Sequence, residues 1–237
     1  MERKELIYNG NSKKFYSTED ERYLIIEFKD EIVADDGRKG YIFGKASTNS
    51  RMSKVIFSLL EEKGVKTHYV DEDDFVSLLV KNTEQLSSYA VVHNYASASY
   101  ADMNGLKEGE YLGSPEVEIV FREEYDEELA DKMEEIALKV NEILVPYFKS
   151  KYMKLVDIRL EFGYDMDGEL IVIDEISLDN CRLWDLYTDI KLDADRFRLD
   201  LGGAEQVYGD VLERIYKDNI DYLSKEEKEK CIEEGWI

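Results

Sequence analysis

The residues best suited to chemistry lie in two neighbouring stretches of the chain. Over residues 155–163, apolar residues alternate with Asp157, Arg159 and Glu161. Successive side chains of a strand point to opposite faces, so this pattern predicts a strand with three charged groups on one face. A second, mostly apolar run ends in Asp174-Glu175, and residues 164–168 between the runs are typical of a hairpin turn. The hairpin is expected to return the acidic pair close to Glu161.

The converging carboxylates of Glu161, Asp174 and Glu175 favour a magnesium site. Mg²⁺ takes a few carboxylates and completes its coordination shell with water and phosphate oxygens. Without a cation, carboxylates gathered in one place would repel each other. The alternative is that these charges only cover a solvated sheet face, and the spacing alone leaves both interpretations open.

A glycine turn near the N-terminus is a candidate phosphate-binding loop. Residues 8–14 read as strand, turn and strand, with Gly10, Ser12 and Lys13 at the turn. Such a turn can place backbone amides and an ammonium group over phosphates. The pattern is neither a P-loop nor a dinucleotide-binding glycine motif, and an ordinary hairpin turn is the alternative.

Two later segments supply arginines suited to anions. Arg182 follows the acidic pair, and Arg198 lies in a second charged segment, 193–198. A guanidinium group binds phosphate or carboxylate through two parallel hydrogen bonds. Ion pairing on a helix surface is the alternative for both.

Composition narrows the class of protein. The 237 residues can bury one core, as one domain or as two packed lobes. With 54 acidic against 31 basic residues, the net charge of −23 argues against a nucleic-acid surface. No apolar run approaches the roughly 20 residues that span a bilayer, and the N-terminus does not resemble a secretory signal. We therefore expect a cytoplasmic protein with neither nucleic acid nor membrane as a partner.

The N-terminal part predicts a small strand-rich lobe. Strands are expected at 6–8, 13–17 and 22–28, separated by polar turns. A helix with an apolar stripe follows, capped by Asn49 or Ser50 and ended by Gly64. A strand at 67–70 runs into an acidic segment, 71–74, where we expect the boundary between lobe 1–74 and lobe 75–237.

The remainder predicts a larger mixed lobe. It begins with apolar strands at 76–80, 89–95 and 116–121 and an amphipathic helix at 127–148. The acidic hairpin comes next, and the C-terminal third is expected to be helical and to end in a charged stretch, 224–235. A strand-rich lobe followed by a mixed lobe is an α+β fold.

Four stretches of the chain carry a resemblance to a known family: YNGNSKKFYST (8–18), FKDEIVADDG (28–37), VDIRLEFG (156–163) with DEISLDNCRLWD (174–185), and LDADRFRLDLGG (192–203). Over about residues 6–212 the chain resembles the SAICAR synthetase family. This resemblance implies a two-lobed SAICAR synthase-like fold with ATP in the cleft between the lobes. It also implies Mg²⁺-dependent activation of a substrate carboxylate by phosphoryl transfer, followed by attack of an amine, which is aspartate in the family.

The resemblance also suggests roles for individual residues. By similarity, Glu161 and Asp174 match magnesium-associated carboxylates, Lys13 a phosphate-facing lysine, and Arg182 an arginine that contacts the ribotide substrate. The complete set of candidates comprises catalytic Lys13, Arg159 and Arg182; ATP-binding Gly10, Ser12, Lys13, Glu161 and Asp174; substrate-binding His93, Ser99, Arg182 and Arg198; and metal-binding Glu161, Asp174 and Glu175.

The sequence departs from the family pattern mainly on the side of the carboxylate substrate. The family's VVRNxxAGS is VVHNYASAS here, which places His93 at the arginine and keeps Ser99. The first lysine of the family's GKxK turn is Asn11, and the substrate-covering loop shrinks to residues 121–124. Replacing a guanidinium by a mostly neutral imidazole removes a phosphate clamp.

These observations leave three hypotheses. The first is an ATP- and Mg²⁺-dependent carboxylate–amine ligase whose carboxylate substrate has changed. The second is an authentic SAICAR synthetase of purine biosynthesis, in which Arg122 or Arg159 compensates for the lost cations. The third is a nucleotide-binding protein without ligase activity. For a ligase, the expected partners are a small-molecule carboxylate and an aspartate-like amine, and a homo-oligomer is possible.

Overall fold

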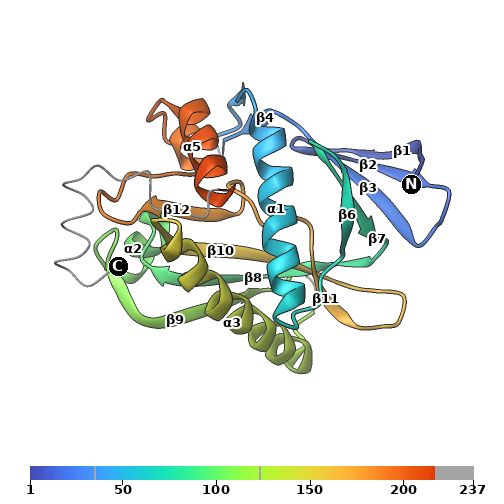
Figure 1. Cartoon of the computed structure of the whole chain (residues 1–237). Coiled ribbons are helices and arrows are strands. Elements are labelled where there is room, and N and C mark those ends of the chain that lie inside the picture. Colours follow the sequence, from blue (N-terminus) through green and yellow to red (C-terminus); the bar gives the residue numbers. More distant parts are fainter. Residues whose placement is uncertain (35, 123, 217–237) are drawn as a thin grey trace.

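Short strands joined by polar turns build the first of two five-stranded antiparallel sheets (Figure 1). The computed structural model describes residues 1–34, 36–122 and 124–216. The strands of the first sheet are β1 (Arg3–Asn9), β2 (Lys13–Thr18), β3 (Tyr23–Phe28), β6 (Tyr69–Asp74) and β7 (Ser77–Lys81), in the order β1-β2-β3-β7-β6. The three strands predicted at the N-terminus are confirmed. The acidic segment 71–74 belongs to edge strand β6, where charged side chains discourage pairing with another chain.

The first sheet continues beyond the expected end of the N-terminal lobe. β7 pairs with both β3 and β6, so a boundary after Asp74 would divide the sheet. The division into lobes 1–74 and 75–237 stays a prediction; a boundary after Lys81 would keep the whole sheet in one lobe. The end of the second lobe, with the predicted stretch 224–235, lies outside the described residues.

Helix α1 (Lys45–Glu62) begins earlier than predicted. Asn49 and Ser50, expected as caps, lie inside the helix and are fully buried. The first turn is capped by Asp30, whose carboxylate accepts hydrogen bonds from the Ala46 amide at 2.8 Å and the Gly44 amide at 3.4 Å. An acceptor 16 residues away replaces the local cap, which is why the sequence pattern misplaced the helix start.

Helix α1 connects the two parts of the molecule. It contacts β3, β6 and β7 of the first sheet and packs against α5 (Ala204–Tyr216). Its buried Met52, Ile56 and Leu60 belong to the main hydrophobic core, which they share with the second sheet. A short hairpin, β4 (Glu31–Val33) and β5 (Lys39–Tyr41), precedes it and was not predicted.

The second sheet has one apolar and one charged face. It contains β8 (Glu84–Tyr95), β9 (Tyr111–Val120), β10 (Met153–Tyr164), β11 (Leu170–Ile173) and β12 (Cys181–Asp185), in the order β11-β10-β8-β9 with β12 beside β10. Helix α3 (Glu127–Ser150) packs on β8, β9 and β10, and the side chain of Asp126 caps its start. The predicted helix and hairpin are confirmed.

The chain after the hairpin is less helical than predicted. β12 is a strand, and only α4 (Asp195–Arg198) and α5 are helical between residue 181 and residue 216. A further short helix, α2 (Ala98–Asn104), lies between β8 and β9. Two antiparallel sheets with helices packed against them form an α+β fold, as predicted.

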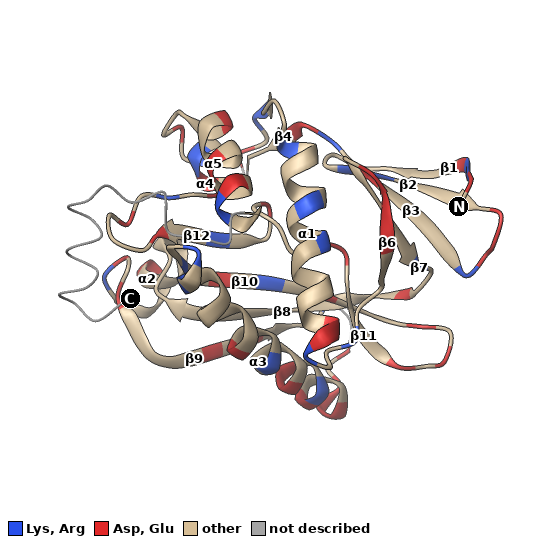
Figure 2. Cartoon of the chain, in the orientation of Figure 1, with Lys and Arg blue, Asp and Glu red and all other residues tan. Residues whose placement is uncertain are grey.

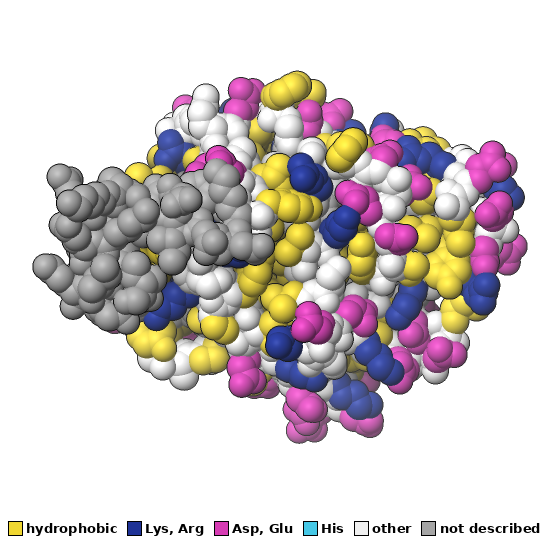
Figure 3. Space-filling view, in the orientation of Figure 1, with side chains coloured by type: hydrophobic (Ala, Val, Ile, Leu, Met, Phe, Trp, Pro, Cys, Tyr) yellow, Lys and Arg dark blue, Asp and Glu magenta, His cyan; other side chains and the backbone are white. Residues whose placement is uncertain are grey.

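The charge of the protein is spread over its surface. Acidic groups mark strand β6 and the N-terminal half of α3, and basic groups lie along α1 (Figure 2). On the face shown in Figure 3, acidic and basic side chains are interspersed, with acidic ones at several separate places. No helix within the described ranges is long and apolar enough to cross a membrane.

Candidate functional site

The register of β8 and β10 places the charged residues of β10 in a row on one sheet face. Glu161 is opposite Tyr89, Arg159 is opposite Val91, and Asp157 is opposite His93. Directly paired residues of antiparallel strands share a face. The prediction that Asp157, Arg159 and Glu161 lie on one face is therefore confirmed. The intervening residues of β10 are buried in the core with α3, so the charged face points away from that helix.

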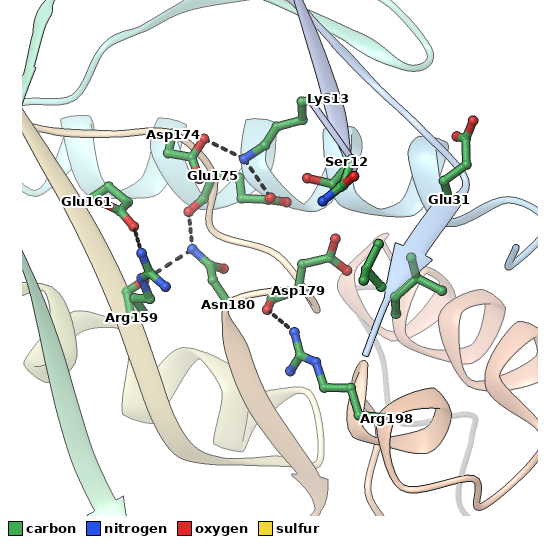
Figure 4. Close-up of a pocket in the computed structure, with 13 residues that line it drawn as sticks. Ser12, Lys13, Glu31, Arg159, Glu161, Asp174, Glu175, Asp179, Asn180 and Arg198 are labelled. Atoms are coloured by element: carbon green, nitrogen blue, oxygen red, sulfur yellow. Dashed lines mark hydrogen bonds and ion pairs between the residues drawn. The ribbon is translucent and has the colours of Figure 1, made fainter. Parts of the chain in front are cut away.

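A cavity of about 310 Å³ opens at the end of this face, between the two sheets (Figure 4). Elements far apart in the chain line it: the glycine turn, strand β4, strand β10, the segment after β11, and α4. The lining residues are Asn11, Ser12, Lys13, Glu31, Ile32, Val33, Arg159, Glu161, Asp174, Glu175, Asp179, Asn180 and Arg198. The structure thus brings together Ser12, Lys13, Arg159 and the three predicted metal-binding carboxylates.

Lys13 is the central cation of the cavity. Its ammonium group forms ion pairs with Asp174 and, at 2.8 Å, with Glu175 (Figure 4). Lys13 is only 9% exposed. Burial opposes its charge, but attraction to Asp174 and Glu175 outweighs burial and raises the pKa of the Lys13 ammonium. A charged lysine is therefore held where a phosphate group could bind.

The neighbouring carboxyl groups are poorly solvated. Burial raises the pKa of Glu175 against the attraction of Lys13, and burial likewise raises the pKa of Glu161 against the attraction of Arg159. Across the part of the chain that the structure describes, no three Asp, Glu, His or Cys side chains form a ready-made metal cluster. The donors are nevertheless of the type that Mg²⁺ prefers. A cation beside them would offset negative charge that is costly to bury.

Arg159 lies at one wall of the cavity. It pairs with Glu161, and its guanidinium stacks on the ring of Tyr89, 3.9 Å from the ring centroid. Asn180 donates hydrogen bonds to the carbonyl oxygens of Arg159 and Glu175. These contacts connect strand β10 to the turn that carries the acidic pair.

Arg182 is placed behind the cavity rather than in its lining. Its Nη1 donates to both carboxylate oxygens of Asp157, at 3.0 and 3.2 Å, and its Nε donates to Asp195 at 3.0 Å. Burial opposes the charge, but these two carboxylates raise the pKa of Arg182. Arg198 also pairs with Asp195, donates to the carbonyl oxygen of Asp179 at 2.8 Å, and does line the cavity.

His93 and Ser99, predicted to bind substrate, are not in the cavity lining. The His93 ring is nearly buried, and its two nitrogens lie 3.8 Å from carboxylate oxygens of Asp157 and Glu118. The ring lies against Tyr100, with centroids 4.3 Å apart. Burial lowers the pKa of His93 despite these carboxylates. Ser99 is exposed in the first turn of α2.

A second, more apolar cavity of about 520 Å³ adjoins the first. Its lining includes Ile7, Tyr8, Phe15, Leu24 and Gln85. Asn11, Ser12, Lys13 and Asp174 line both cavities, and Gly10 lines the second. The glycine turn therefore separates a charged cavity from an apolar one.

Asp179 is a cavity residue that the sequence analysis did not identify. It pairs with the fully buried ammonium of Lys45 at 2.7 Å and accepts a hydrogen bond from the Tyr208 hydroxyl at 3.0 Å. Burial opposes its ionisation, yet Lys45 and these donors lower the pKa of Asp179. The only sequence signal was its position inside the motif at 174–185.

Comparisons with known proteins identify the family of this chain. The SAICAR synthetase family model matches residues 6–129 and 123–215. The phosphoribosylaminoimidazole-succinocarboxamide synthase of Coprothermobacter proteolyticus is 42% identical over 236 residues, covering 91% of this chain and 99% of that protein.

Solved structures of SAICAR synthetases are similar to this chain as well. A SAICAR synthetase (type 2) in complex with ADP is 37% identical, with a TM-score of 0.85 over 91% of this chain and 99% of that one. The Pyrococcus horikoshii SAICAR synthetase (type 1) is also 37% identical, with a TM-score of 0.81 over 88% of this chain and 100% of that one. These matches confirm the predicted two-lobed fold. The chain therefore belongs to the SAICAR synthetase family, and with it to the ATP-dependent ligases that form a carbon–nitrogen bond.

Proposed function

We propose that this protein is an authentic SAICAR synthetase, which uses ATP to join the carboxylate of a phosphorylated imidazole ribotide to the amine of aspartate. The observation that carries the proposal is the position of Lys13, a buried cation between a charged and an apolar cavity. The relatives with this activity in their names match it over nearly their full length. Their names and their sequence identity to this chain favour the authentic enzyme over the hypothesis of a changed carboxylate substrate.

The nucleotide is proposed to span the two cavities. The apolar cavity offers Tyr8, Phe15 and Leu24 to the base, and the glycine turn at Gly10 and Ser12 offers backbone amides to the phosphates. Lys13 lies where the two cavities meet. The related SAICAR synthetase solved in complex with ADP supports the binding of a nucleotide by this chain.

Magnesium is the metal that these donors suit. Asp174, Glu175 and Glu161 would hold it, and when bound it would neutralise charge on the phosphate oxygens. Lys13 pairs with two of the same carboxylates. We therefore expect its ammonium to shift toward the phosphates when metal and nucleotide are present.

The reaction needs charge neutralisation and positioning more than covalent help from the protein. An oxygen of the substrate carboxylate attacks the γ-phosphorus, ADP leaves, and an acyl phosphate forms. The amine nitrogen then attacks the acyl carbon and loses a proton, and phosphate leaves with one former carboxylate oxygen. Lys13 and Arg159 supply positive charge to the transferring phosphoryl group, and Arg182 holds Asp157 and Asp195 in place behind them.

A second candidate function retains the ATP chemistry but uses a less negatively charged carboxylate substrate. The observation that favours it is His93, whose lowered pKa leaves the ring mostly neutral between Glu118 and Asp157. The donors of Arg182 are largely taken up by two carboxylates. This part of the charged face therefore has little positive charge for a phosphate. A nucleotide-binding protein without ligase activity has no support in the relatives, which carry ligase names.

Steady-state kinetics separates the candidates. For the authentic enzyme, kcat/KM for the ribotide carboxylate with aspartate should be about 10⁴ M⁻¹s⁻¹ or higher, within the ordinary enzyme range. A much lower value, with faster ADP release from another acid, would favour the second candidate. Oxygen label in the substrate carboxylate should appear in phosphate, whereas formation of AMP would contradict the acyl-phosphate route.

The metal assignment has its own test. The double substitution Glu161→Gln, Asp174→Asn should abolish Mg²⁺-dependent ATP turnover, and Asp73→Asn on strand β6 should leave it unchanged. Turnover retained in the double variant would overturn the assignment. A cytoplasmic location is proposed with the function, and a homo-oligomer stays a prediction.

A further inference from the structure

Asp174 has an unusual backbone conformation for an aspartate. It follows strand β11 with φ at 72°, in the left-handed region that favours glycine. Its carboxylate points into the charged cavity and pairs with Lys13 (Figure 4). Such conformations persist where the surrounding structure holds them, and they gather at functional sites. The direction of this carboxylate therefore depends on whatever holds the Asp174 backbone.

The imidazole of His68 holds that backbone. Its Nε2 lies 3.1 Å from the carbonyl oxygen of Asp174. A carbonyl oxygen only accepts hydrogen bonds, so Nε2 must carry the proton and donate it. His68 is 3% exposed, and the ring of Phe57 packs edge-on against it at 5.4 Å.

The main chain at His68 is anchored on two sides. Its amide donates to the carbonyl oxygen of Val172 in β11 at 3.0 Å, and its carbonyl oxygen accepts from the Lys81 amide at 2.7 Å. These two hydrogen bonds fix the backbone that carries the ring to both sheets.

We propose that His68 is a positioning residue for nucleotide and metal binding. Its Nε2–H group holds the carbonyl of Asp174 and so keeps the carboxylate aimed at Lys13 and the phosphate-binding region. This inference rests on the proposed function, because it assigns His68 to the same nucleotide site. A residue that only filled space would need no donor at this place. A partly buried carbonyl that loses its donor is left unsatisfied, at a cost in free energy that a rotation of the peptide can relieve.

The experiment compares His68→Gln with His68→Leu. Glutamine can present an amide N–H close to the position of Nε2, and leucine fills apolar space without a donor. Binding of Mg-ADP is measured by calorimetry, and KM is measured for ATP and for the amine. We expect His68→Leu to bind Mg-ADP roughly tenfold more weakly, with KM for ATP raised and KM for the amine nearly unchanged. His68→Gln should stay within about threefold of the wild type.

A matched control separates positioning from packing. Phe57→Leu loosens the packing around His68 and keeps its donor, so it should lower the melting temperature without weakening Mg-ADP binding. If His68→Leu does not fold, His68→Asn replaces it, because the shorter amide does not reach the carbonyl of Asp174.

The outcomes are distinct. Wild-type affinity in His68→Leu, or equal losses in the Leu and Gln variants, would overturn the inference and leave the proposed function standing. Absence of Mg-ADP binding in the wild type would overturn both.

Discussion

Replacing Lys13 by methionine should destabilise the protein far more than a typical lysine substitution. The change removes the ammonium that pairs with Asp174 and Glu175 and keeps a side chain of similar length. Glu175 is only 4% exposed and Lys13 only 9%. Loss of the Lys13 ammonium would leave Glu175 as a buried carboxylate without its ion-pair partner at 2.8 Å.

The magnitude follows from this burial. Removing one partner of a buried ion pair costs about 3–5 kcal/mol, because the remaining charge stays away from water. The matched control is Lys14→Met, one residue along the same strand. Lys14 pairs with Glu27 at 2.6 Å, and 30% of its side chain is exposed. This pair is only partly buried, and pairs in full contact with solvent contribute about 0–1 kcal/mol. The loss in free energy of unfolding should therefore be clearly smaller for Lys14→Met than for Lys13→Met.

The pH dependence gives a second signature. Burial raises the pKa of Glu175 in the folded protein above its unfolded value, so the folded state binds more protons and stability falls as pH rises through the folded pKa. Without Lys13 that pKa should rise further. The destabilisation by Lys13→Met should therefore be largest near pH 8 and shrink toward pH 5.5. The Lys13 ammonium itself remains charged across this range, since attraction to Asp174 and Glu175 outweighs burial and raises its pKa.

Urea unfolding at pH 5.5 and pH 8, followed by circular dichroism, provides the measurement. The free energy of unfolding is extrapolated to water for the wild type and both variants. A loss in Lys13→Met no larger than that in Lys14→Met at pH 8 would refute the argument. So would a loss that grows as the pH is lowered.

Three further predictions concern parts of the fold away from the Lys13 pair. Asp126→Ala should cost about 1 kcal/mol in urea unfolding, because the Asp126 side chain accepts the hydrogen bond from the Leu129 amide at the start of α3. Burial raises the pKa of Asp193 to about 7, so stability should fall between about pH 4 and pH 7. In thermal melts across this range, the melting temperature of Asp193→Asn should depend less steeply on pH than that of the wild type. Gly40→Ala should cost about 1–3 kcal/mol in thermal or urea unfolding, because a β-carbon there would lie 2.3 Å from the ring of Phe197. Unchanged stability in this variant would contradict that packing.

The sequence determined much of the second sheet by itself. Strict alternation over residues 156–162 identified the strand and the face that carries Asp157, Arg159 and Glu161. The turn residues at 164–168 identified the hairpin, and the apolar stripe at 127–148 identified helix α3. These features depend on residues close together in the chain, where strand and helix periodicity is a direct consequence of backbone geometry. The family motifs added the candidate residues Lys13, Glu161 and Asp174.

Other features were decided by tertiary structure alone. The start of α1 depends on Asp30, and the charge on Lys13 depends on Asp174, 161 residues away in the chain. Local patterns carry no information about which distant group will satisfy a helix end or neutralise a buried charge. Arg182 looked free to bind a substrate in the sequence, but folding places it between Asp157 and Asp195. Burial is likewise a property of the packed molecule, so only the fold could show that Asp179 lines the cavity and that His68 contacts the backbone of Asp174.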